Sequence, residues 1–442
     1  MASTRIYRTP STTGTPTKFT YSVWFKRGNL GAYSLIGGAK TSDPSNYKCC
    51  LYFNSNDRIQ FEQYGTGLHF NYQTVRRFRD NSAFYHLVVR YDSTDGTAGD
   101  RIRMYINGVE ETAWQTESNP ASSQVCYIGS TQDYFTDIGN SVDSGYFDGS
   151  MSHINFCDGQ AYAASDFGET DSTSGIWKIK TSPSVTYGTN GFFLKGEDSS
   201  NLDLDSSGNN LSFTTAGILT ATKDNPSNNF ATLNPLFNSA GYFSSNTQTL
   251  VFANGNTYAG KVTHGFYNTT LAVSSGKFYW EVKIQDTNCM FGVTAIRPNG
   301  GVSYGYDDAT CYAYYPYDDR LTFAGASQGT GSGDYDNTSD KIYMFAVDAT
   351  NNKMWYGRDG TFIGSPSGGT GNTFTLSADH EWSPFFQPLS TAQNNNASFN
   401  FGNGYFATTA ITSAGTNASG NGTFEYDVPT GFTALCTKGI NS

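Results

Sequence analysis

The chain has 442 residues, of which 15% are charged and 15% are aromatic, and 48 are glycine. At about 150 residues per domain, this length allows two or three domains, and the low charge argues against coiled coils and charged disordered segments. Abundant glycine, asparagine, serine and threonine are typical of short strands joined by many turns. An all-β protein is therefore expected.

The net charge and the start of the chain restrict the partners and the compartment. The formal net charge is −11, which disfavours nucleic acid as a partner because its phosphate backbone is also negative. No apolar run approaches the roughly 20 residues of a membrane helix, so we expect no membrane insertion. Residues 1–8 lack the apolar stretch of a secretion signal, which predicts assembly in a cytoplasm. Seven scattered cysteines without a C-x-x-C pair predict free, mostly buried thiols.

The pattern along the chain predicts two β-rich halves. Residues 1–18 are polar and are interpreted as an arm, either flexible or a docking strand, and residues 19–220 form the first domain. Within it, Arg101–Ile106 has an apolar side chain at every second position, which predicts a half-buried strand, and Asn107–Gly108 is typical hairpin-turn chemistry. Residues 221–238 carry two prolines and are predicted to be a linker. The strand rhythm returns in residues 239–442, the second domain.

The first half contains three runs in a distinctive order: SAFYHLVVRYD (82–92), DRIRMYINGVEE (100–111) and YFDGSMSHINF (146–156). Over about residues 18–165 they resemble a laminin-G or concanavalin A-like jelly-roll domain. The second half contains GKFYWEVKI (276–284), FGVTAI (291–296), DKIYMFAVDATNNKMWYGRDGTFIG (340–364) and FNFGN (399–403). It resembles a SPRY domain over about residues 240–435. Together the two resemblances imply tandem concanavalin-like antiparallel β-sandwiches, or jelly rolls.

A laminin-G-like sandwich joined to a SPRY-like sandwich is similar to appendage or fibre proteins of marine tailed bacteriophages. This resemblance implies a place on the virion surface, assembly in the host bacterial cytoplasm, a homotrimer and contacts with other virion proteins. The basic residues of the first part of the chain are candidates for docking to the particle, with a solvated arm as the alternative: Arg5, Arg8, Lys18, Lys26 and Arg27.

Enzyme motifs are absent from the sequence. Jelly-roll glycosidases use a Glu-x-Asp-x-x-Glu string, whose paired carboxylates perform acid–base chemistry, and the nearest match, Glu169–Ser174, has a serine in place of the last acid. The five histidines are far apart, and no Gly-x-Ser-x-Gly motif occurs. We therefore expect a non-enzymatic protein. A glycan hydrolase is the least favoured alternative.

One short segment fits the first half of a calcium loop. Asp203, Asp205 and Ser207 supply alternating oxygens and are followed by Gly208, which lets a backbone wrap around a hard cation. The acidic residue expected at the twelfth position is replaced by Thr214. No other cofactor is expected.

A stretch of interleaved tyrosines and aspartates is the candidate ligand site. Aromatic rings stack on the apolar faces of sugars while carboxylates accept hydrogen bonds from hydroxyls. The candidate residues are Tyr304, Tyr306, Asp307, Asp308, Tyr314, Tyr315, Tyr317, Asp318 and Asp319. The alternative is ordinary packing, because Cys311, Ala313 and Tyr315 alternate with Tyr312 and Tyr314 as in a strand.

Two functions follow as hypotheses. In the first, the chain is a tail fibre or receptor-binding protein that attaches to carbohydrate or protein on the host cell surface. In the second, it is a capsid decoration or head-fibre protein that contacts only other virion proteins.

Overall fold

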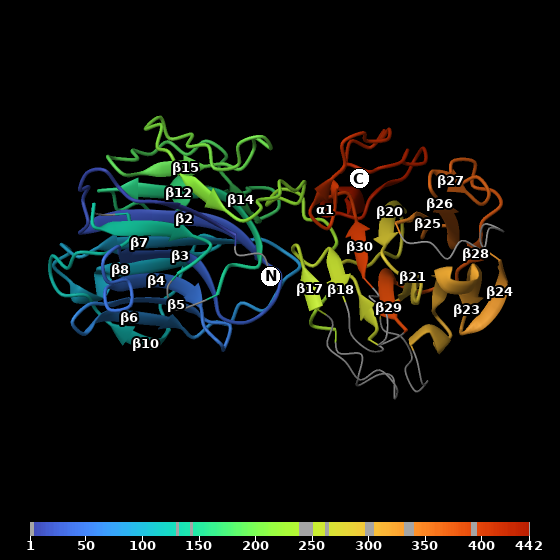
Figure 1. Cartoon of the computed structure of the whole chain (residues 1–442), viewed down its shortest axis with the longest axis horizontal. Coiled ribbons are helices and arrows are strands. Elements are labelled where there is room, and N and C mark those ends of the chain that lie inside the picture. Colours follow the sequence, from blue (N-terminus) through green and yellow to red (C-terminus); the bar gives the residue numbers. More distant parts are fainter. Residues whose placement is uncertain are drawn as a thin grey trace. The chain divides into compact units, whose positions relative to one another are not determined.

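The computed structural model describes residues 4–129, 132–141, 145–237, 251–260, 265–296, 305–330, 340–389 and 396–441. These residues form β-strands, a few 3-10 turns and one short helix, α1 (Thr437–Ile440), so the all-β prediction is confirmed (Figure 1). None of the described helices is long and apolar enough to cross a membrane. The chain divides into two compact units, unit 1 (Met1–Ala221) and unit 2 (Thr222–Ser442).

Unit 1 is built on two antiparallel sheets. Within the described ranges, the larger sheet has the order β10 (Trp114–Ser118), β6 (Leu68–Thr74), β5 (Ile59–Tyr64), β4 (Lys48–Phe53), β3 (Tyr33–Lys40), β11 (Tyr134–Ile138), β1 (Arg5–Arg8) and β16 (Thr214–Ala216). The smaller sheet has the order β15 (Phe192–Leu194), β12 (Gly149–Asp158), β2 (Lys18–Arg27), β7 (Tyr85–Asp92), β8 (Ile102–Ile106) and β9 (Val109–Glu110). A small hairpin joins β13 (Gly168–Thr170) to β14 (Trp177–Ile179).

The hairpin predicted in the first half is present. Ile102, Met104 and Ile106 of β8 are buried in the core of unit 1. Asn107 and Gly108 both have positive φ angles, 50° and 82°, as a two-residue turn of this kind requires. All seven cysteines are buried, as predicted.

The arm predicted at residues 1–18 is not a separate element. Strand β1 pairs with β11 on one side and with β16 on the other, and Arg5 makes an ion pair of 2.6 Å with Asp137, which is buried. Lys26 and Arg27 are buried in β2, so they are not available for docking to a particle. The four residues of β1 are too few to show an alternation, and both partner strands lie more than 120 residues further along the chain.

Unit 2 also has two main sheets. In the part of the chain that the structure describes, one runs β17 (Val251–Ala253), β18 (Tyr258–Gly260), β30 (Ala397–Asn400), β20 (Lys277–Ile284), β25 (Ile342–Asp348), β26 (Lys353–Arg358) and β27 (Thr361–Phe362), with β28 (Phe374–Thr375) beside β26 and β33 (Thr433–Ala434) parallel to β20. The other runs β19 (Tyr267–Asn268), β29 (Trp382–Pro388), β21 (Cys289–Ala295), β22 (Tyr312–Tyr315), β23 (Arg320–Phe323) and β24 (Ala326–Thr330).

The linker predicted at residues 221–238 is in large part a packed segment of unit 2. Phe230, Ala231 and Leu233 are buried in its cores, and the Ala231 N–H donates a hydrogen bond of 2.9 Å to the carbonyl oxygen of Leu435. Prolines and irregular spacing indicate only that this segment is not a regular strand. They do not exclude burial, which here depends on contacts with the far end of the chain.

Candidate functional site

Three residues of the tyrosine–aspartate stretch are buried structural residues. The Tyr314 ring lies in the core of unit 2, stacked on Tyr356 at a centroid distance of 4.2 Å, and its hydroxyl donates a hydrogen bond of 2.8 Å to Asp319. Asp308 accepts hydrogen bonds from the N–H and the hydroxyl of Thr310 at 2.8 and 2.6 Å. The prediction that Asp308, Tyr314 and Asp319 face a ligand is therefore wrong, because the strand alternation of β22 directs Tyr314 inward.

Two further residues of the stretch are only partly accessible. Tyr306 is half-buried against the apolar cluster that contains Cys311 and Ala313, and its N–H donates to the side-chain oxygen of Gln387 at 3.0 Å. Asp307 ends a 3-10 turn and is also half-buried. Tyr304 lies outside the described residues. Tyr306 and Asp307 do not form an open surface.

The remaining predicted residues form an accessible group together with one neighbouring arginine. We call this group the tyrosine cluster: Tyr315, Tyr317, Asp318 and Arg320. Tyr317 is 46% exposed, and its ring stacks on Tyr315 with the centroids 5.7 Å apart. The Arg320 guanidinium lies 5.3 Å from the centre of the Tyr315 ring and 3.3 Å from a carboxylate oxygen of Asp318. The cluster thus presents an aromatic face beside one anion and one cation.

The orientation of the tyrosine cluster is set by its neighbours. The Tyr315 hydroxyl donates a hydrogen bond of 3.0 Å to the side-chain oxygen of Asn288, and burial raises the pKa of Tyr315 to about 12, so the phenol stays protonated at neutral pH. Asn288 and Arg320 are absent from the predicted site. Arg320 directly follows the predicted aspartates, whereas Asn288 precedes another strand and has no signal in the local sequence.

The residues of the predicted calcium loop form a hydrogen-bonded turn. One oxygen of Asp205 accepts the N–H groups of Phe193 and Ser207 at 3.0 and 2.9 Å. The other accepts the N–H of Leu211 and the hydroxyl of Ser207 at 2.9 and 3.0 Å. Asp203 accepts the hydroxyl of Thr215. Among the described residues, no group of three or more His, Cys, Asp or Glu side chains could hold a metal ion. In the structure Asp203, Asp205 and Ser207 therefore take part in a hydrogen-bonded turn.

A buried Ser22–His86 contact in unit 1 has the appearance of a nucleophile and its base. The Ser22 hydroxyl lies 2.9 Å from Nε2 of His86, and the Trp177 indole N–H donates to Nδ1 at 2.9 Å. Because an indole can only donate, neutral His86 carries its proton on Nε2 and donates it to Ser22. This is the reverse of the polarity that activates a serine. The contact therefore links β2 and β7 of the smaller sheet to Trp177 of the β13–β14 hairpin.

The burial of His86 predicts acid sensitivity of unit 1. Burial lowers the pKa of His86 to about 3, against an unfolded value near 6.5. The unfolded chain then binds more protons below pH 6.5, so stability falls as the pH decreases towards 3. We expect a loss of about 2 kcal/mol between pH 7 and pH 5 from this residue. Calorimetry of the full chain at both pH values, with His86→Gln as the comparison, would measure it. An equal loss in the variant would contradict the assignment.

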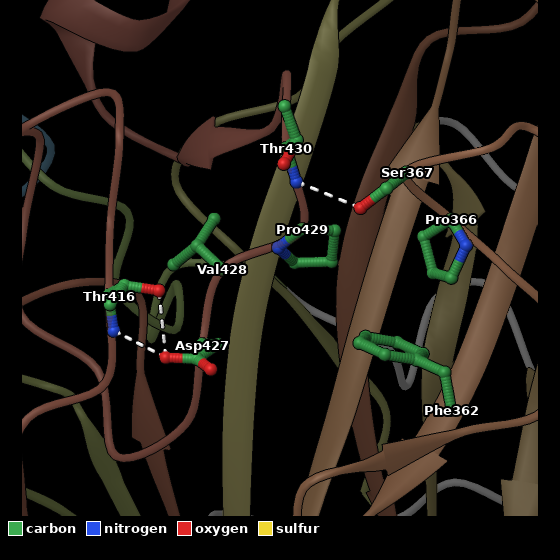
Figure 2. Close-up of a pocket in the computed structure, with 8 residues that line it drawn as sticks. All are labelled: Phe362, Pro366, Ser367, Thr416, Asp427, Val428, Pro429 and Thr430. Atoms are coloured by element: carbon green, nitrogen blue, oxygen red, sulfur yellow. Dashed lines mark hydrogen bonds between the residues drawn. The ribbon is translucent and has the colours of Figure 1, made fainter.

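A shallow hollow of about 320 Å³ lies in unit 2 (Figure 2). Its lining residues are Phe362, Pro366, Ser367, Thr416, Asp427, Val428, Pro429 and Thr430. Asp427 accepts hydrogen bonds from the N–H and hydroxyl of Thr416 at 2.6 and 2.8 Å, and the Thr430 N–H donates to Ser367 at 3.0 Å. These bonds hold the surrounding loops in place.

A polar network in unit 1 was not predicted to be a site. Gln60 and Glu62 of β5 are hydrogen-bonded at 2.8 Å, and Gln60 also bonds Asn71 and Gln73 of β6 at 3.2 Å each. We call these four residues the amide plate. The signal in the sequence is the set of amide and carboxylate side chains at alternate positions of RIQFEQY and LHFNYQT.

The first unit is similar to a known family over most of its length. Residues 3–165 match the family model of the concanavalin A-like lectin/glucanases superfamily. The predicted laminin-G or concanavalin-like fold of this part is thereby confirmed. A search of curated proteins finds no match.

Several solved structures are similar to parts of the chain. The SPRY domain of human HERC1 is 16% identical, with a TM-score of 0.29, over 36% of this chain and 96% of that one. A heptameric SAP-like pentraxin from Limulus polyphemus is 13% identical, with a TM-score of 0.27, over 37% and 72%. Domain 4 of the arabinanase AbnA from Geobacillus stearothermophilus, in complex with arabinotriose, is 17% identical, with a TM-score of 0.27, over 34% and 64%.

Proposed function

We propose that the chain is a non-enzymatic binding protein that recognises carbohydrate through the tyrosine cluster of unit 2. The observation that carries this proposal is the exposed ring of Tyr317, stacked on Tyr315 and flanked by Asp318 and Arg320. An aromatic face suits the apolar C–H face of a sugar, and the neighbouring charged groups suit its hydroxyls. The match of residues 3–165 to the concanavalin A-like lectin/glucanases superfamily supports a role in carbohydrate recognition. The polarity at Ser22 and His86 does not activate that serine for catalysis.

The finer role that we propose is attachment of a bacteriophage virion to its host. In this role the chain is a tail fibre or receptor-binding protein on the virion surface, assembled in the bacterial cytoplasm as a homotrimer with other virion proteins as neighbours. Its ligand is a glycan or protein of the host surface. Repeated display on a particle strengthens weak single-site binding, because later contacts become intramolecular. The resemblance of the two-domain sequence to phage appendage proteins motivates this role.

The proposal predicts that Tyr317→Ala weakens binding while the fold is kept. We expect at least a fivefold loss of affinity, since stacking on an aromatic ring contributes about 1 kcal/mol or more. The measurement is binding of the labelled full chain to a glycan array and to intact bacterial cells, with thermal melting to verify folding. Tyr314→Ala is unsuitable as a test because it removes a core ring, a change that costs about 3–5 kcal/mol of stability.

Tyr146→Ala, which removes a tyrosine that is 36% exposed in unit 1, is the matched control and should bind as the parent does. Equal affinity of Tyr317→Ala and the parent would refute the site. No binding of the folded chain to any glycan or cell would refute the function and favour a capsid decoration or head-fibre role.

A further inference from the structure

We propose that the hollow of unit 2 is a docking site for a lysine side chain of a partner protein. Figure 2 shows Phe362, Pro366 and Ser367 across the hollow from Thr416 and Asp427. The hollow shares no residue with the tyrosine cluster, so this inference goes beyond the carbohydrate site and does not depend on it.

The apolar part of the hollow fits the stem of a long side chain. Its lining residues Pro366, Val428 and Pro429 are buried, and Phe362 is half-buried. The Phe362 ring lies edge-on to the ring of Tyr279, with the centroids 6.3 Å apart. The methylene stem of a lysine lies along apolar surface of this kind while its charged end stays near water.

Asp427 supplies an unpaired carboxylate oxygen beside this apolar surface. Its Oδ1 accepts the hydrogen bonds of 2.6 and 2.8 Å from the N–H and hydroxyl of Thr416. No donor from the described residues contacts Oδ2, and Figure 2 shows this oxygen directed away from Thr416. The two bonds from Thr416 also lower the pKa of Asp427, so its carboxylate is charged at neutral pH.

The geometry favours an ammonium group over a guanidinium group. A guanidinium binds a carboxylate best when both oxygens accept its parallel N–H bonds, but Oδ1 of Asp427 is already engaged by Thr416. An ammonium is a compact charge that needs only acceptors. Ser367 accepts one bond, from the Thr430 N–H, so its hydroxyl oxygen keeps a lone pair as a further acceptor.

The loops that form most of the lining carry only negative charge. Residues 363–373 contain no charged side chain, and residues 411–430 contain Glu425 and Asp427 and no basic side chain. Carboxylates on the walls of a concave surface attract cations. The charge of the lining is therefore complementary to a lysine.

The basic residues on the neighbouring strands have positions or partners of their own. Three are paired with aspartates: Lys277 with Asp348 at 3.4 Å, Lys283 with Asp340 at 3.9 Å and Lys341 with Asp359 at 3.1 Å. Lys353 of β26 donates from Nζ to the carbonyl oxygen of Gly369 at 2.7 Å. The alternation along β26 places Arg358 on the opposite face of the strand from Lys353.

The walls of the hollow are fixed by hydrogen bonds. Ser365 and Thr370 close one loop with backbone bonds of 2.9 and 3.1 Å, and the Trp355 indole N–H donates to the Thr370 carbonyl oxygen at 2.9 Å. In the opposite wall, the Val428 N–H donates to the carbonyl oxygen of Thr416 at 2.8 Å. A site held in this manner loses less conformational entropy when a ligand binds.

The shallow form of the hollow indicates a side chain that projects from a larger molecule. Its volume of about 320 Å³ is at the lower end of the range for small-molecule pockets, about 300–1,000 Å³, and such pockets enclose most of their ligand. A shallow hollow covers only one side of a stem. A lysine on the surface of a partner protein meets this condition, because its backbone stays outside.

The test measures binding of the full chain to acetylated tripeptides with lysine, arginine or norleucine between two glycines. Each is displayed at the same density through biotin on a streptavidin surface. Arginine keeps the charge without the ammonium group, and norleucine keeps a stem without the charge. We expect the lysine probe to bind about fivefold more tightly than the other two, which is the upper range for an exposed ion pair.

Asp427→Asn should weaken binding of the lysine probe about fivefold for the same reason. The asparagine keeps an oxygen that accepts from Thr416, and thermal melting verifies that the fold is kept. Asp379→Asn, which removes the same charge at another exposed position of unit 2, is the matched control and should bind as the parent does. If Asp427→Asn is unfolded, the comparison of the three probes on the parent chain decides.

Four results would overturn the proposal. Equal binding of the lysine and arginine probes, or equal losses in Asp427→Asn and Asp379→Asn, would show a general attraction between charges. Absence of binding to the lysine probe would refute the site. Displacement by free putrescine, at concentrations at which the free lysine tripeptide has no effect, would assign the hollow to a small diamine. Tyr317→Ala should bind the lysine probe as the parent does, so failure of the carbohydrate site and failure of this site are separate results.

Discussion

Replacement of Arg27 by leucine is expected to lower the free energy of unfolding of unit 1 by about 3–5 kcal/mol, because it breaks a buried ion pair. Arg27 is 1% exposed. Its guanidinium donates to Asp57 at 3.2 Å, to the carbonyl oxygen of Phe78 at 2.6 Å and to that of Gly31 at 3.0 Å. It also lies 4.2 Å from the centre of the Phe53 ring. One side chain therefore connects three loops at one end of the sandwich.

Urea unfolding of the full chain would measure the effect of Arg27→Leu. Arg27→Lys should recover little of the loss, because an ammonium group cannot reproduce the planar fork that reaches several acceptors at once. Arg79→Ala is the control: Arg79 is paired with the same Asp57 at 2.9 Å, but its side chain is 53% exposed. An exposed partner of this kind contributes about 1 kcal/mol or less. Equal losses in Arg27→Leu and Arg79→Ala would contradict the interpretation.

Glu281→Ala should destabilise unit 2 by about 3 kcal/mol or more, because several buried donors would lose their acceptor. Glu281 has no exposed surface. Its two oxygens accept from the Tyr279 hydroxyl at 2.9 Å, the Asn400 amide at 3.0 Å, and the N–H groups of Glu425 and Tyr426 at 3.0 and 2.9 Å. The side chain thereby fastens the segment near the end of the chain to the centre of the larger sheet.

Hydrogen exchange of residues 424–428, together with urea unfolding, would test this role of Glu281. We expect the exchange protection of these amides to decrease in Glu281→Ala, and to a smaller extent in Glu281→Gln, which keeps one accepting oxygen. Glu381→Gln, at an exposed position of unit 2, is the control and should change stability by less than about 0.5 kcal/mol. Full protection of residues 424–428 in a destabilised Glu281→Ala would show that the segment is held by other contacts.

The candidate ligand site illustrates how far local patterns reach. The alternation of Cys311–Tyr315 is compatible with Tyr314 as a core residue. In the structure Tyr314 is buried in the core of unit 2. Tyr317 follows a proline beyond the end of the strand, where no alternation applies, and it is exposed. The sequence order predicted the region, but it could not distinguish the ring that faces solvent from the ring that packs.

The all-β class, the two β-rich halves and hairpins such as Ile102–Val109 were determined by the sequence alone. These features depend on residues two to four positions apart, because side chains alternate along a strand and a tight turn needs residues that tolerate positive φ angles. Only the tertiary structure decided the inclusion of β1, the burial of Phe230 and Leu233, the amide plate and the partners of Arg27 and Glu281. In each case the decisive contact joins different strands or loops, such as Arg5 with Asp137 or Glu281 with Tyr426. The chain topology brings these groups together. The spacing of residues within a short segment does not predict such contacts.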